Sequence, residues 1–144
     1  MSSLKQPNRD DYPDAAEKHL NDADYLLNVE RYDGAAYLSG YIVECSLKSL
    51  IQFETGQVSK DHEFDKIHKN MMRLCAQANS KTAKYASSRA VRDLLKSDIM
   101  KWVPGIRYSS EGNISPEDSK KWITEANEIF ISTILEMRLD RVIT

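Results

Sequence analysis

The chain is poor in the residues that cross-link or interrupt a fold, since its 144 residues include only two cysteines, five glycines and four prolines. Cys45 and Cys75 stand thirty positions apart, and both fall where we expect buried helix faces. We therefore expect no disulfide and interpret both thiols as small core residues in a reducing cytoplasm. A chain of this length can bury enough apolar surface to fold as one domain without such cross-links.

Long apolar runs are also missing. No stretch approaches the roughly 18 consecutive apolar residues that a membrane-spanning helix needs. The first residues, Met1-Ser2-Ser3-Leu4-Lys5, lead into polar residues, so we expect no secretory signal.

Several motifs of catalytic and cofactor sites are absent. Neither G-x-x-x-x-G-K-[ST] nor G-x-G-x-x-G occurs, so no phosphate-cradling loop is predicted. His62 and His68 are six residues apart, a spacing that does not bring both rings to one helix face, and no third ligand is recognisable. We therefore expect no metal and no cofactor. Ser109 and Ser110 lack an adjacent base, so nucleophilic catalysis has no support.

Alternating strand patterns are missing too, and helical periodicity takes their place. Apolar residues at helical spacing predict five helices, at about 13–30, 34–54, 64–78, 88–101 and 117–138. The predicted fold is all-α, an up-and-down bundle of about five helices similar to a four-helix bundle. The expected domain spans residues 12–138, with flexible termini at 1–11 and 139–144.

Three positions mark the expected helix ends. Asp33 is a suitable N-cap for the second helix, and Gly56 is a suitable left-handed residue at its end. Ser115 followed by Pro116 predicts the start of the last helix.

The helix at 34–54 is apolar around most of its circumference and should occupy the centre of the bundle. Four side chains on one edge depart from that pattern: Tyr37, Tyr41, Glu44 and Lys48. Buried charges need partners, and part of that need is met because Glu44 and Lys48 are spaced i, i+4.

Arg107 is the expected second partner of Glu44. It follows Pro-Gly in a loop at 101–110, and we expect its guanidinium to reach Glu44 with Tyr41 and Tyr108 on either side. Two interpretations remain open. The contact is a polar latch that ties the loop to the central helix, or the groove binds an anionic ligand, such as a nucleotide phosphate, through Arg107 and Lys48.

Charge is distributed unevenly along the chain. Residues 57–101 carry ten basic and five acidic side chains, whereas residues 1–56 carry five basic and ten acidic ones. The basic third either faces a nucleic acid or an acidic partner, or is a solvated helix surface. No compact basic run with interleaved aromatic residues supports the first interpretation.

The order of these motifs resembles the HEPN domain family. The resemblance covers about residues 12–138, and it rests on four segments, Ala16-Glu17-Lys18-His19-Leu20, Arg31-Tyr32-Asp33-Gly34-Ala35-Ala36-Tyr37, Gly40-Tyr41-x-x-Glu44-Cys45-x-Leu47-Lys48 and Arg107-Tyr108-Ser109. It implies a small helical bundle, commonly a homodimer, often encoded beside a minimal nucleotidyltransferase. It also implies nucleotide binding or RNA cleavage in toxin–antitoxin systems.

One departure from the family decides the functional expectation. The nuclease branch carries Arg followed four to six residues later by His, and here no histidine follows Arg107 at that spacing. No arginine precedes His19, His62 or His68 at that spacing either. We therefore expect no catalytic residues of that type. The favoured function is a non-catalytic nucleotide- or RNA-associated module that dimerises and pairs with a nucleotidyltransferase or antitoxin partner. The alternative is a divergent toxin-type ribonuclease or nucleotide-processing enzyme.

Overall fold

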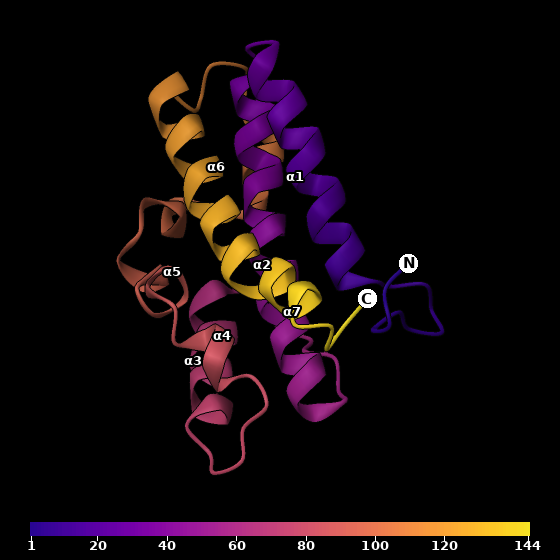
Figure 1. Cartoon of the computed structure of the whole chain (residues 1–144). Coiled ribbons are helices and arrows are strands. Elements are labelled where there is room, and N and C mark those ends of the chain that lie inside the picture. The colour runs from indigo at the N-terminus through magenta and orange to yellow at the C-terminus, as the bar shows by residue number, and fades with distance from the viewer.

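The computed structural model describes residues 1–144 and consists of helices and turns without a strand (Figure 1). The long helices are α1 (Tyr12–Asn28), α2 (Tyr32–Thr55) and α6 (Pro116–Phe130), the last continued by the π turn η4 (Ile131–Leu135) and by α7 (Glu136–Leu139). Helix α2 packs against α1, α6 and the shorter α3 (Phe64–Cys75). The predicted all-α fold with α2 at its centre is confirmed.

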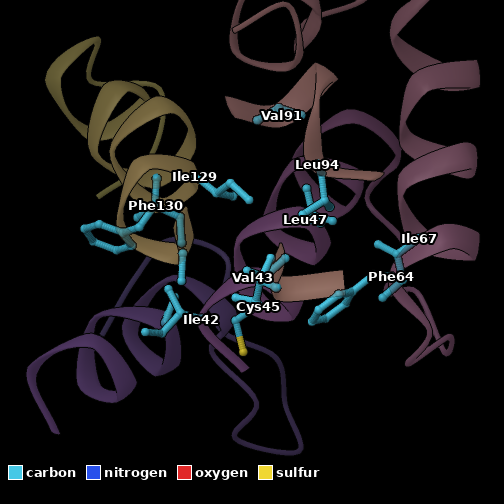
Figure 2. Packing of buried hydrophobic residues seen from close by; sticks show 14 of the residues in the cluster. Ile42, Val43, Cys45, Leu47, Phe64, Ile67, Val91, Leu94, Ile129 and Phe130 are labelled. Atoms are coloured by element: carbon cyan, nitrogen blue, oxygen red, sulfur yellow. The ribbon is translucent and has the colours of Figure 1, made fainter. Parts of the chain in front are cut away.

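The buried apolar side chains form one core of 29 residues. Figure 2 shows Val43 and Leu47 of α2 in its middle, between Ile129 of α6 and Phe64 of α3. Helix α2 therefore contributes buried side chains on several sides at once. Burying one aliphatic side chain of this size stabilises the fold by about 1.5–3 kcal/mol. No helix has the combination of length and apolarity needed to cross a membrane.

Two of the three expected helix ends are confirmed. Gly56 ends α2 in the left-handed region with a φ of 73°. The Ser115 hydroxyl accepts a hydrogen bond from the Asp118 amide at 3.0 Å at the start of α6. The prediction that Asp33 caps α2 is wrong, because the helix begins at Tyr32 and Arg31 is the cap residue.

The predicted helix at 88–101 is interrupted in the structure. The segment contains α5 (Arg89–Arg92) and two 3-10 turns, η1 (Leu94–Lys96) and η2 (Asp98–Lys101), after the four-residue α4 (Ala83–Ala86). Its physical cause lies in α6, where the Glu125 carboxylate accepts hydrogen bonds from the Asp98 and Ile99 amides at 3.1 and 3.2 Å. Because these two amides donate to a side chain of α6, they do not donate to the preceding backbone carbonyls as they would in a continuous helix. The short turn η2 starts at this point instead.

Residues near both ends of the chain make contacts with other parts of the fold. Ser2 is buried, and its hydroxyl donates a hydrogen bond to the Asp11 carboxylate at 2.6 Å. Gln52 of α2 donates to the Leu4 carbonyl at 2.7 Å. Ile143 is also buried. Contacts between residues far apart in sequence hold these ends, so helical periodicity carries no sign of them.

Trp102 fixes the segment that leads to η3 (Pro104–Tyr108). Its indole lies against α2 at Gly40, where a β-carbon would meet the ring at far less than van der Waals distance. The indole Nε1 donates a hydrogen bond to the Tyr37 carbonyl at 2.9 Å. A residue without a side chain is therefore required at position 40.

We predict that Gly40→Ala lowers the free energy of unfolding by about 1–3 kcal/mol, because the new methyl group must displace the indole from α2. The higher helix propensity of alanine offsets part of this loss. Urea denaturation measures the change. Gly105→Ala is the control, since no atom lies within 4 Å of its added methyl group. Equal stability of the two variants would contradict the assigned role of Gly40.

Candidate functional site

The predicted edge of α2 lies beneath two loop segments. The loop after α2 reaches it through His62, and the segment before η3 reaches it through Trp102, whose ring centre is 5.1 Å from that of Tyr41. One helix edge thus meets residues from two later parts of the chain.

Glu44 and Lys48 form a buried ion pair. The Lys48 Nζ lies 2.9 Å from Glu44 Oε1, and only 2% and 6% of the two residues' surfaces are exposed. The same carboxylate oxygen lies 2.8 Å from His62 Nδ1, and the Tyr12 ring centre is 5.5 Å from Nζ. Because Glu44 has both Lys48 and His62 as partners, these contacts offset the free-energy cost of removing the Glu44 and Lys48 charges from water.

Tyr37 and Tyr41 form a hydroxyl pair next to this ion pair. Their oxygens are 3.2 Å apart, and their rings pack edge to face with centres 5.2 Å apart. Burial, reinforced by the bond to Tyr37, raises the pKa of Tyr41 to about 12. The Tyr41 hydroxyl is therefore protonated at neutral pH and able to donate a hydrogen bond.

Arg107 lies on the surface beside the tyrosine pair. The neighbouring Tyr37 hydroxyl, followed by Tyr108, raises the pKa of Arg107. The guanidinium carbon lies 4.8 Å from the centre of the Tyr108 ring, a cation–π geometry. Tyr108 itself is 80% exposed. A cation and an aromatic ring are thus presented together to solvent.

The expected contact between Arg107 and Glu44 is not formed. Glu44 is paired with Lys48 and His62, and Arg107 lies beside Tyr37. Tyr37 precedes Glu44 by seven residues, which is about 10 Å along a helix. Arg107 therefore meets the edge two turns before the carboxylate. The Glu44 carboxylate instead pairs with His62, which belongs to a different loop, the one directly after α2.

Sequence reasoning missed the aromatic contacts of Trp102. Phe64 stacks on its ring with centres 5.3 Å apart, and Tyr41 contacts it edge to face. The sequence did contain one indication of them, Gly40, because a glycine inside a helical pattern often has a packing reason, such as the close approach of another group. It identifies position 40 but not the residue that approaches.

His19 of α1 extends this aromatic group. Its ring centre is 5.7 Å from that of Tyr41, and its Nδ1 is buried without a hydrogen-bond partner. Burial, together with the neighbouring Lys18, lowers the pKa of His19. A neutral imidazole therefore stands beside the tyrosine pair at neutral pH.

The loop that follows η3 is anchored at the start of α2. The Asp33 carboxylate accepts hydrogen bonds from the Gly112 and Ile114 amides at 2.5 and 2.7 Å. Arg31 pairs with Glu111 at 3.2 Å. With Trp102 on the other side, these contacts fix both ends of the segment that carries Arg107.

The cysteines and His68, which could in principle react or bind a metal, are held in structural positions. Burial raises the pKa of the Cys45 thiol to about 12, so it is not a nucleophile at neutral pH, and both cysteines are free. His68 is buried, with its Nε2 2.7 Å from the Val91 carbonyl oxygen. No cluster of three potential metal ligands occurs in the chain.

Comparison with known proteins places the chain in a family. The model of the HEPN domain matches residues 11–135, which is most of the chain. The chain therefore belongs to the HEPN domain family, as its motifs indicated. No curated protein and no solved structure matches it.

We predict an asymmetry within the buried ion pair. Glu44→Leu strands the Lys48 ammonium and should cost about 3–5 kcal/mol of unfolding free energy, the usual penalty for breaking a buried pair. Lys48→Met should cost less, because the Glu44 carboxylate still has His62 as a hydrogen-bonding partner. The double variant should recover most of the loss. Urea denaturation of the three variants tests this, and an equal cost for the two single changes would contradict it.

We also predict that His19 titrates below 6.5 in an NMR pH series, because burial disfavours its charged form. In the unfolded chain this group takes up its proton at higher pH than in the folded one. The free energy of unfolding should therefore fall as pH drops from 6.5 through the folded pKa. His19→Asn should reduce that fall, and a midpoint above 6.5 would contradict the prediction.

Proposed function

We propose that this HEPN-domain chain is a non-catalytic module that binds a nucleotide or RNA through Arg107 and Tyr108. In this proposal the chain also associates with itself and pairs with a nucleotidyltransferase or antitoxin partner, as is common in the family. The observation that carries the proposal is the exposed guanidinium over an exposed ring, held beside the hydroxyls of Tyr37 and Tyr41.

The chemistry of these groups fits a nucleotide. Arg107 has no carboxylate within ion-pair distance, so its charge is available to a phosphate. Tyr108 is exposed and has a second ring face, opposite the one that Arg107 covers, on which a base can stack. Such stacking is worth about 1–3 kcal/mol per base. The protonated Tyr41 hydroxyl adds a neutral donor next to the cation.

Lys48 has a different role in the proposal. Its ammonium is held by Glu44 inside the bundle, and a ligand would have to break that pair to reach it. We assign Glu44, Lys48 and His62 to a structural latch that holds the loop after α2. The proposed ligand-binding site consists of Arg107, Tyr108, Tyr37 and Tyr41.

A divergent ribonuclease is the second candidate function, and His19 is the observation that favours it. The imidazole is close to Tyr41, its pKa is lowered and one ring nitrogen has no partner. A neutral imidazole can act as a general base, and this one lies next to Tyr41, one of the side chains assigned to the ligand site. In this alternative the histidine comes from α1 and not from the segment after Arg107.

We predict that Arg107→Ala weakens the binding of fluorescently labelled single-stranded RNA, measured by anisotropy, by about tenfold or more. Tyr108→Ala should weaken it by a similar factor through lost stacking. Arg89→Ala is the matched control, because this arginine is also exposed but pairs with Asp93 at 3.6 Å. The absence of RNA and nucleotide binding by folded wild type would reject the proposal.

The same RNA incubated with the wild-type chain separates the two candidate functions. Intact RNA supports the binding module. Cleavage that is lost in both His19→Asn and Arg107→Ala would favour the ribonuclease instead.

A further inference from the structure

A small cavity lies beside Trp102, where the loop after α2, the start of α3 and the segment that leads into η3 meet. It has a volume of about 210 Å³, and its apolar walls come from Phe64, Met100, Trp102, Val103 and Pro104. Cavities for drug-sized ligands measure about 300–1,000 Å³, so this one has room for a smaller group, such as a single nucleobase. The ligand site assigned to Arg107 and Tyr108 does not use this cavity.

The polar edge of the cavity contains a carboxylate without a cationic partner. Asp65 lines the cavity from the first turn of α3, is exposed, and belongs to no ion pair within the chain. The other carboxylate at this edge, Glu63, pairs with Lys66 at 3.0 Å. An ionised carboxylate only accepts hydrogen bonds. Asp65 is therefore an acceptor that remains available to a ligand in the cavity.

His62 adds a second acceptor at the same edge. Its Nδ1 lies 2.8 Å from Glu44 Oε1, an oxygen that also contacts the Lys48 ammonium. Because the carboxylate accepts, Nδ1 donates the hydrogen of this bond, and in the neutral ring Nε2 then has a free lone pair. The His62 side chain is 72% exposed, so Nε2 is accessible to a ligand. The groups available at this edge thus accept hydrogen bonds and do not donate them.

We propose that this cavity binds a guanine base of the nucleotide or RNA ligand. Guanine presents two adjacent donors on its Watson–Crick edge, N1–H and the 2-amino group, and these match the two carboxylate oxygens of Asp65. Adenine and cytosine present one donor next to an acceptor on that edge, and uracil presents one donor between two acceptors. An edge of the cavity that only accepts therefore selects guanine. This inference rests on the proposed function and specifies the base that its ligand contains.

The cavity and Arg107 lie along the same edge of α2. His62, at the cavity, contacts that edge at Glu44. Arg107 lies beside Tyr37, which precedes Glu44 by seven residues, or about 10 Å along a helix. The Trp102 indole packs on α2 between these two contacts. A single strand can therefore place a guanine in the cavity while a neighbouring nucleotide meets Arg107.

Two lysines of the basic segment at 57–101 stand near the cavity. Lys69 follows Asp65 by four residues on α3, so the two share one face of that helix. Lys60 precedes His62 by two residues in the loop. Both lysines are exposed and belong to no ion pair within the chain. Their charges attract the phosphates beside a bound base and disfavour a cationic protein side chain as the occupant.

Anisotropy with labelled single-stranded RNA tests the inference. A strand of adenines with one central guanine should bind the wild-type chain about tenfold more tightly than adenines alone. Inosine in place of that guanine lacks the 2-amino group and should lose most of this preference. Asp65→Asn should abolish the preference, because its amide places a donor where the carboxylate accepted. Asp61→Asn is the matched control, since Asp61 is also exposed but does not line the cavity.

The other outcomes separate this inference from the proposed function. Equal binding of the two strands by wild type rejects the guanine site and leaves the proposed function standing. A guanine preference that survives in Asp65→Asn shows that another surface reads the base and rejects the cavity. Binding of neither strand, nor of guanosine monophosphate, rejects the proposed function and this inference together.

Guanosine monophosphate as a competitor identifies the source of the base. Displacement at the affinity of the guanine strand assigns the cavity to a free nucleotide. Weaker displacement assigns it to a strand that also contacts Arg107.

Discussion

The contact between Trp102 and Gly40 is the constraint on which the candidate site depends. Because Gly40 has no side chain, the indole lies directly on α2 and bonds to the Tyr37 carbonyl. Phe64 stacks on the indole's ring, so α3 is joined to the same point. The chain then turns through η3 and presents Arg107 beside Tyr37. Packing in the core and geometry at the surface thus have one common cause.

The edge of α2 separates into two chemically different halves. Toward its C-terminal end, Glu44 and Lys48 neutralise each other in the interior, and His62 adds the loop after α2 to the pair. Toward its N-terminal end, the paired hydroxyls of Tyr37 and Tyr41 lie next to the exposed Arg107. Charge that is neutralised inside the fold stabilises structure, whereas charge without a partner at the surface is available to a ligand. This difference is why we assign binding to Arg107 and not to Lys48.

Local patterns predicted much of the fold. The apolar stripes identified α1, α2, α3 and the helix that begins at α6, and Gly56 and Ser115 marked ends that the structure confirms. The segment at 88–101 was less predictable, because Glu125 on a distant helix supplies acceptors that break it into short turns. The prediction that Asp33 caps α2 was wrong for a similar reason, since its carboxylate accepts hydrogen bonds from amides about eighty residues away in sequence.

The sequence by itself determined the helical class, the central position of α2, the family, and the pairing of Glu44 with Lys48. Each of these follows from spacing along one chain segment, where 3.6 residues per turn decides which side chains are neighbours. Only the tertiary structure decided that His62 and not Arg107 joins Glu44, that Trp102 occupies the space above Gly40, and that Arg107 lies beside Tyr37. These contacts join segments separated by loops, and their register depends on how whole helices pack, which periodicity does not encode.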